Sequence, residues 1–300
     1  MRGLIGKVVA LTLLFGSTAV CADEAASQLL TRWQSIRVME PTETAASEIA
    51  EIELLFARSL DRPMKPATVG AWAELGFGSE PLQLQGDACH LLFENPEARL
   101  GRGMFLLCPT RAQASTLLIP HGFHDRFTAE IGVLFATEGR FRAVAWNTAP
   151  RTIPGDDEST LDRHDATQTT ENYFTGLARA ASVLGLPGPM VQLHGFAPQL
   201  RTTEEGRNAR AILSSGTNAP SASTLEAARC LEGELGDRLL VYPTEVVELG
   251  GTQNRVAAVL RNWGRKDFLH LELSFALRQR LLEDAEARRS FVKCVGGASQ

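Results

Sequence analysis

The chain has 300 residues, with 30 Lys and Arg against 35 Asp and Glu, and a net charge of −5. Acidic and basic residues are interspersed and no basic stripe is present, which argues against nucleic acid as a partner. A hydrophobic content of 44% is ordinary for a globular protein, and the length suffices for one large domain or two modest ones.

The N-terminus, residues 1–22, has the pattern of a cleavable signal peptide. Arg2 and Lys7 give a positive start, an apolar run covers residues 8–15, and small side chains lead to Ala22. The apolar run is shorter than the roughly 20 residues that a bilayer requires. We expect cleavage after Ala22 rather than lipidation at Cys21 or retention as an anchor. The mature protein is then periplasmic or secreted, with no membrane association.

Four cysteines remain after this cleavage, and an even number in an exported chain predicts two disulfides. Cys89 and Cys108 flank two apolar strands, so antiparallel pairing of these strands would bring the two sulfur atoms together. Cys230 and Cys294 form the second pair by default. A cysteine metal cluster is the alternative, and the absence of a C-x-x-C spacing argues against it.

The chain after the signal peptide is expected to divide into two parts. Residues 23–70 form an N-terminal helical segment, because apolar residues recur at helical spacing on both sides of Pro41. Residues 71–300 form the main domain, which begins with short strands separated by Gly and Pro up to about residue 119.

From residue 120 onward, apolar strands alternate with amphipathic helices. Strands are expected over residues 141–146, 190–193 and 268–273, and Ser274 is placed to cap a helix over 275–292. Alternation of this kind predicts an α/β sandwich around a mixed, mostly parallel sheet.

Polar residues follow three of these strands near the points where they end. His121 and His124 come after one strand, His194 after another, and Glu272 lies at the end of the last. Ligands of open α/β sheets bind outside the carboxyl ends of the strands. Two closely spaced imidazoles and a distant third match the three ligands of a catalytic zinc site. We predict that His121, His124 and His194 bind Zn²⁺, which lowers the pKa of a bound water to about 7, and that Glu272 transfers protons.

Other interpretations of these residues stay open at this stage. Each histidine is individually compatible with a hydrogen-bonded structural role, and His270 is placed to support the site from the same strand as Glu272. A serine hydrolase would use Ser214 or Ser215 after a strand, but the chain has no G-x-S-x-G sequence there. A non-catalytic exported ligand-binding protein on the same fold is the remaining alternative.

The order of these motifs resembles the zinc carboxypeptidase superfamily over residues 115–285. That superfamily includes deacylases of the succinylglutamate desuccinylase and aspartoacylase type and, more distantly, N-formylglutamate amidohydrolases. The resemblance is carried by His121-Gly122-Phe123-His124, Trp146-Asn147-Thr148-Ala149-Pro150-Arg151, Asp162-Arg163-His164-Asp165, Gln192-Leu193-His194-Gly195 and Leu269-His270-Leu271-Glu272-Leu273-Ser274. The carboxypeptidases have His-x-x-Glu as the first ligand pair, so the second ligand here is His124 or the neighbouring Asp125.

The resemblance implies a three-layer α/β sandwich and hydrolysis of an amide bond in an amino acid derivative or short peptide. It also implies that Arg151 or Arg163 anchors a carboxylate of this small substrate, with Asn147 in the same pocket, because a guanidinium group matches a carboxylate in bidentate fashion. Arg126 is the alternative anchor.

Overall fold

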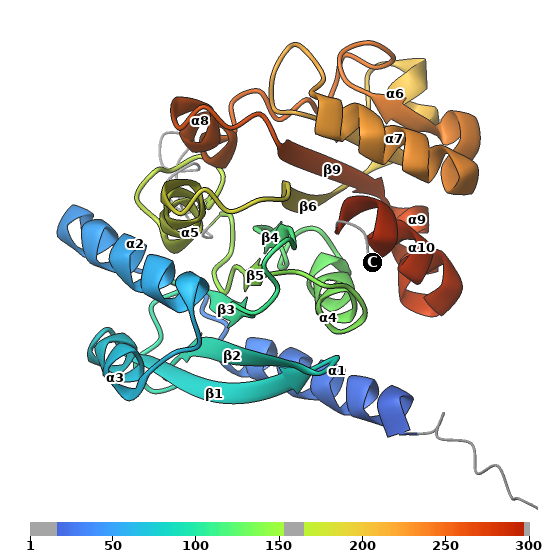
Figure 1. Cartoon of the computed structure of the whole chain (residues 1–300). Helices are drawn as coiled ribbons and strands as arrows, with labels where there is room; N and C mark the ends of the chain where they lie inside the picture. Colours follow the sequence, from blue (N-terminus) through green and yellow to red (C-terminus); the bar gives the residue numbers. More distant parts are fainter. Residues whose placement is uncertain (1–16, 153–164, 297–300) are drawn as a thin grey trace, which may run out of the picture.

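The computed structural model describes residues 17–152 and 165–296, which form nine strands and ten α-helices around one mixed sheet (Figure 1). The strands are β1 (Phe77–Leu84), β2 (Asp87–Glu94), β3 (Met104–Leu107), β4 (Thr116–Ile119), β5 (Ala143–Trp146), β6 (Met190–Phe196), β7 (Ala211–Ser214), β8 (Leu239–Val241) and β9 (Phe268–Ser274). The helices are α1 (Ser17–Ser35), α2 (Ala46–Asp61), α3 (Pro66–Glu74), α4 (Thr128–Glu138), α5 (Tyr173–Val183), α6 (Glu204–Asn208), α7 (Ala222–Leu235), α8 (Arg255–Asn262), α9 (Phe275–Glu283) and α10 (Ala285–Val295).

The sheet has the strand order β1-β2-β3-β5-β4-β6-β9-β7-β8. Its four central strands, β5, β4, β6 and β9, pair in parallel, as do β7 and β8 at one edge. The remaining pairs are antiparallel, including the β1–β2–β3 meander at the other edge. The mixed α/β sheet expected from the sequence is therefore present, with parallel pairing concentrated in its centre.

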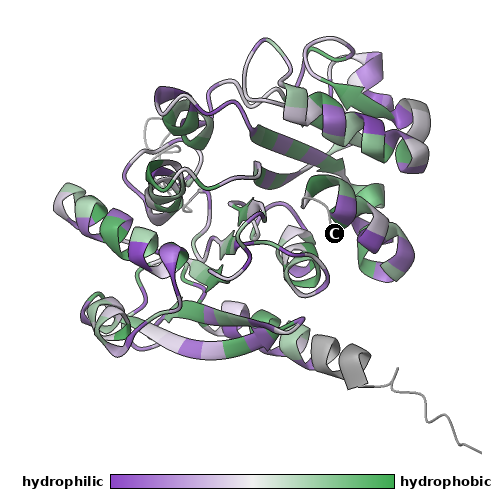
Figure 2. Ribbon diagram, viewed as in Figure 1, coloured by the Kyte–Doolittle hydropathy of each residue, from purple (hydrophilic) through white to green (hydrophobic). Residues whose placement is uncertain are grey.

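Helices cover both faces of this sheet, so the central strands are buried on both sides. In β4, Leu117 and Ile119 belong to a core that includes side chains of α1, α4, α7, α9 and α10. Leu118, between them, belongs to a second core with α2, α3, α5 and α8. Polar side chains interrupt this pattern at few places, and β9 is one of them: hydrophilic bands alternate with hydrophobic ones along its ribbon (Figure 2).

The region after β9 differs from the single helix expected over 275–292. Ser274 caps α9 as predicted, since its hydroxyl accepts a hydrogen bond from the N–H of Leu277. The helix ends at Glu283, however, and Asp284 begins a new one by accepting hydrogen bonds from the N–H groups of Glu286 and Ala287. Such a side-chain cap competes with continuation of the first helix.

Both predicted disulfides are present. Cys89 in β2 is joined to Cys108, directly after β3, which extends the antiparallel register of the two strands. Cys230 of α7 is joined to Cys294 of α10, so the second bridge ties together two helices that pack on the same face of the sheet.

The N-terminal region begins with α1, whose Leu29 and Trp33 are buried in the core. Residues 1–16 of the predicted signal peptide lie outside the described residues. No helix in the described part of the chain has the length and apolar character needed to cross a membrane. The cleavage site and the division of the chain at residue 70 stay predictions.

Candidate metal centre

Three parallel central strands bring the chemically informative residues together. β4 ends at Ile119, directly before Pro120, which has no N–H to continue the ladder, and His121 follows in the turn that leads into α4. His194 lies in β6, and Glu272 is its partner in the parallel register with β9. Because residues paired in register point to the same face of a sheet, His194 and Glu272 emerge side by side.

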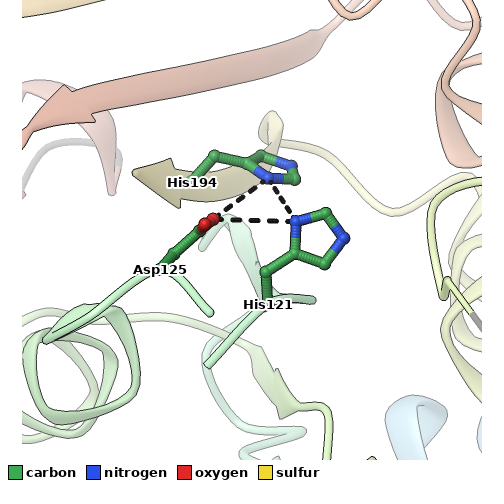
Figure 3. Close-up of side chains that lie close together, drawn as sticks. All are labelled: His121, Asp125 and His194. Atoms are coloured by element: carbon green, nitrogen blue, oxygen red, sulfur yellow. Dashed lines mark hydrogen bonds and ion pairs between the residues drawn. The ribbon is translucent and has the colours of Figure 1, made fainter. Parts of the chain in front are cut away.

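His121, Asp125 and His194 form a buried cluster in which three ligand atoms converge (Figure 3). The Nδ1 atoms of the two histidines lie 3.1 Å apart, and Oδ2 of Asp125 lies 3.6 Å from each of them. Both histidines are 5% exposed. Two imidazole nitrogens and one carboxylate oxygen are a donor set that zinc accepts in proteins.

The second nitrogen of each ring faces a hydrogen-bond acceptor. Nε2 of His121 lies 2.9 Å from Oδ1 of Asp165, and Nε2 of His194 lies 3.0 Å from Oε1 of Gln192. Each Nε2 therefore carries a hydrogen, which leaves two Nδ1 lone pairs opposed unless a proton or a cation lies between them. Histidines that bind a metal are held in this way, with the non-ligating N–H donated to a carboxylate or amide oxygen.

The carboxylates around His121 favour a positive charge at this point. Although burial alone would lower the pKa of His121, hydrogen bonds and charges from Asp125 and Asp165 raise it to about 9. Burial lowers the pKa of His194, and the charge on His121 lowers it further. Burial opposes ionisation of Asp125, yet its hydrogen bonds to both histidines hold its pKa below the usual range. Without a metal, the cluster thus holds one proton, which a divalent cation would displace.

The second member of the predicted ligand pair is corrected by this geometry. His124 lies outside the cluster: its ring nitrogens face the backbone N–H of Arg151, at 3.5 Å, and the hydroxyl of Thr152, at 3.4 Å. Asp125 is instead directed toward His194, because its Oδ2 accepts a hydrogen bond of 2.9 Å from the N–H of Gly195. Of the two residues left open by the sequence, Asp125 is the one in contact with His121 and His194.

Glu272 is next to this cluster and nearly buried, with an exposure of 8%. A carboxylate oxygen of Glu272 and ring nitrogens of His194 and His270 all lie within 4.8 Å of one another. Burial, together with the negative charge of Asp125, raises the pKa of Glu272 to about 8. Within the described ranges its carboxylate has no arginine within 4.0 Å, and the only basic side chain that close is His270, whose Nε2 lies 3.8 Å from Oε1 of Glu272. This environment suits a group that exchanges protons near neutral pH.

The cluster opens into a cleft of about 610 Å³ whose lining includes three arginines, Arg151, Arg201 and Arg278. The side chain of Arg151 is 48% exposed and its Nε lies 2.8 Å from Oδ2 of Asp165, so this guanidinium lies beside the cluster with part of its surface exposed. Arg278 is held more tightly, because it donates hydrogen bonds to the carbonyl oxygens of Arg126 and Phe196.

The other two predicted substrate-binding residues are Arg163 and Asn147. Arg163 lies outside the described residues. Asn147 is 4% exposed and does not line the cleft: its Nδ2 donates to the carbonyl oxygen of Pro120, and its Oδ1 accepts from the N–H of Ala149. These bonds connect the loop after β5 to the end of β4, which is a structural role.

No role was predicted from the sequence for Asp165 and Gln192, which accept hydrogen bonds from the two histidine rings, or for Arg201, which lines the cleft. A signal existed for Gln192, since it precedes His194 by two residues on a strand and so shares its face. Asp165 and Arg201 lie in loops, where no periodic pattern predicts the direction of a side chain.

Comparisons with known proteins give distant likenesses only. No family model and no curated protein sequence matches the chain. Among solved structures, a candidate carboxypeptidase A from Shewanella denitrificans aligns with 85% of this chain and 68% of its own, at 10% identity and a TM-score of 0.38. A candidate carboxypeptidase from Burkholderia mallei aligns with 78% and 67%, at 10% identity and a TM-score of 0.37. A gene product from Agrobacterium tumefaciens aligns with 62% and 93%, at 12% identity and a TM-score of 0.38. Likenesses this distant establish neither a family nor an activity, so the side chains of the site must carry the functional conclusion.

Proposed function

We propose that this protein is an exported zinc-dependent hydrolase that cleaves an amide bond in an amino acid derivative or short peptide. We also propose that its two-sided helical cover of the sheet is a three-layer, carboxypeptidase-like sandwich. The observation that carries the function is the convergence of Nδ1 of His121, Nδ1 of His194 and a carboxylate oxygen of Asp125 beside Glu272. The two disulfides support export, because such bonds persist in oxidising compartments.

The residues present fit a catalytic zinc site. His121, Asp125 and His194 would hold the ion, and three protein ligands leave a coordination position for water or substrate. When bound, zinc supplies a Lewis acid that polarises a carbonyl oxygen and lowers the pKa of water to about 7. The acceptors Asp165 and Gln192 fix the orientation of the two imidazole rings, which strengthens them as ligands.

Glu272 would move the proton that the reaction requires. Its carboxylate accepts the proton of the attacking water and then donates it to the nitrogen of the leaving amine. A group whose pKa of about 8 lies near the working pH is able to do both. Burial of Glu272 also limits exchange of that proton with bulk solvent.

The cleft favours a substrate with an anionic group. Arg151 is the candidate anchor for a carboxylate, because it stands beside the cluster and half of its side chain is exposed. A guanidinium group binds a carboxylate through two parallel hydrogen bonds, which fixes the distance from the anchor to the scissile bond. Amino acid derivatives and short peptides carry such a carboxylate.

Turnover of a panel of N-acyl amino acids and dipeptides by the purified, zinc-loaded protein tests the proposal. We expect release of a free amino group from at least one of them, and the chelated protein should be inactive. Glu272→Gln is the matched control, since it preserves shape but cannot accept a proton. It should retain zinc and stability while kcat falls by roughly 10²–10⁴-fold. Wild-type protein that binds zinc without any turnover above the chelated control would identify a binding protein instead.

A further inference from the structure

The proton of His194 is assigned to one ring nitrogen by residues outside the cluster. The assignment starts at the helix α8, whose N-cap is Asn254. Oδ1 of Asn254 accepts a hydrogen bond of 3.2 Å from the N–H of Ala257, as a capping side chain does. The amide of Asn254 therefore has a fixed orientation, with its oxygen on the helix and its Nδ2 directed away from it.

The fixed amide of Asn254 in turn determines the orientation of the Gln192 amide. Nδ2 of Asn254 donates a hydrogen bond to Oε1 of Gln192, which is fully buried. The reverse orientation of Gln192 would oppose two NH₂ groups, so its oxygen must face Asn254. Within residues 17–152 and 165–296, Nε2 of Gln192 has no hydrogen-bond partner that would favour the reverse orientation.

The same oxygen lies 3.0 Å from Nε2 of His194. Gln192 and His194 are two residues apart on β6 and so project from the same face of the sheet. Because an amide oxygen only accepts hydrogen bonds, Nε2 of His194 carries the proton. The lone pair on Nδ1 is then directed toward Nδ1 of His121 and Oδ2 of Asp125.

We propose that Asn254 and Gln192 are positioning residues for the metal centre: the cap of α8 fixes the amide of Gln192, and this amide fixes the tautomer of His194 that binds a metal. The inference deepens the proposed function and rests on the same site. It also explains why two amide side chains are buried next to His194, where apolar residues would pack without needing hydrogen-bond partners.

We call the chain of hydrogen bonds from Asn254 through Gln192 to His194 the relay. The substitution Asn254→Asp tests it. An aspartate still caps α8, but it presents only acceptors to Gln192, so the amide of Gln192 should rotate and offer its NH₂ group. That group would donate to Nε2 of His194 and move the proton to Nδ1, where it blocks the metal. We expect zinc affinity to fall by about 10–100-fold, the usual effect of losing a supporting partner of a ligand.

Two matched variants separate the relay from a loss of packing. Asn254→Ser keeps a capping oxygen on α8 but places no acceptor against Gln192, so its loss of zinc affinity should be smaller than that of Asn254→Asp. Gln192→Glu presents oxygens to both Asn254 and His194 in either orientation, so it should retain the proton on Nε2. Thermal unfolding of the metal-free variants checks that each one folds.

The tautomer is measured without metal, by two-bond ¹H–¹⁵N correlations of the histidine ring in the full-length protein. We expect Nε2–H in the wild type and in Gln192→Glu, and Nδ1–H in Asn254→Asp. A wild-type Nδ1–H signal, an unchanged tautomer in Asn254→Asp, or equal losses of zinc affinity in Asn254→Asp and Asn254→Ser would overturn the relay. If the tautomers change as expected but the wild type binds no zinc, the relay stands and the proposed zinc-dependent function fails.

Discussion

Zinc affinity should depend on pH in a way that follows from the charges around His121. The pKa of His121 is raised to about 9, so below pH 9 the metal-free cluster holds a proton that zinc must displace. Raising the pH removes this competitor, and affinity should therefore rise with pH. One displaced proton gives a tenfold change per pH unit, or about 30-fold between pH 6.0 and 7.5.

Asp165→Asn is the informative perturbation, because it preserves an acceptor for Nε2 of His121 but removes a negative charge. The pKa of His121 should fall toward its ordinary value of 6.5. The gain in affinity between pH 6.0 and 7.5 should then shrink to less than about tenfold, since a smaller fraction of the protein carries the competing proton. Absolute affinity should also decrease, because a partner of the ligand is weakened.

The assay is competition for zinc against a chelator of known pH dependence, with calorimetry in two buffers of different ionisation enthalpy to count the protons released. We expect about one proton per zinc ion at pH 7 in the wild type and fewer in Asp165→Asn. A wild-type affinity that is independent of pH, or an identical slope in the two proteins, would refute the electrostatic reasoning.

Three further predictions concern other parts of the molecule. Replacing Cys89 and Cys108 together by serine opens a loop with a sequence separation of 19 and should lower the free energy of unfolding by about 3 kcal/mol, as measured by denaturant titration; an unchanged value would contradict the bridge. N-terminal sequencing of the exported protein should begin at Asp23, and an intact Met1 would rule out cleavage. Arg151→Gln should raise KM by roughly 10–100-fold with little change in kcat, because the anchor binds substrate and transition state alike; a loss confined to kcat would place Arg151 elsewhere in the mechanism.

Most of the correct predictions from the sequence rest on the spacing of residues within a strand and on the pairing of neighbouring strands. The alternation of Leu269, His270, Leu271 and Glu272 indicated which face of the last strand is polar, and the leucines of that strand do lie in a core. The pairing of Cys89 with Cys108 followed from two adjacent strands. Such features depend on neighbours in the chain, whose relative positions are set by the period of a strand.

The direction of side chains in loops depends on contacts that are distant in sequence. His124 and Asp125 are neighbours in one turn. The side chain that faces His194 is that of Asp125, because it accepts a hydrogen bond from the N–H of Gly195, 70 residues away. Asn147 is likewise turned from the cleft by the carbonyl oxygen of Pro120. No spacing rule within the turn distinguishes the two candidate ligands, so choosing between them required the structure.

Zinc content of the wild type and two neighbouring variants tests the central claim most directly. Native mass spectrometry of the purified protein should find about one zinc ion per chain, bound by His121, Asp125 and His194. Asp125→Ala should lose the ion, whereas His124→Ala should retain it, because His124 faces Arg151 and Thr152 instead of the cluster. A wild type without zinc, or loss of zinc from His124→Ala with retention in Asp125→Ala, would contradict the metal centre described above.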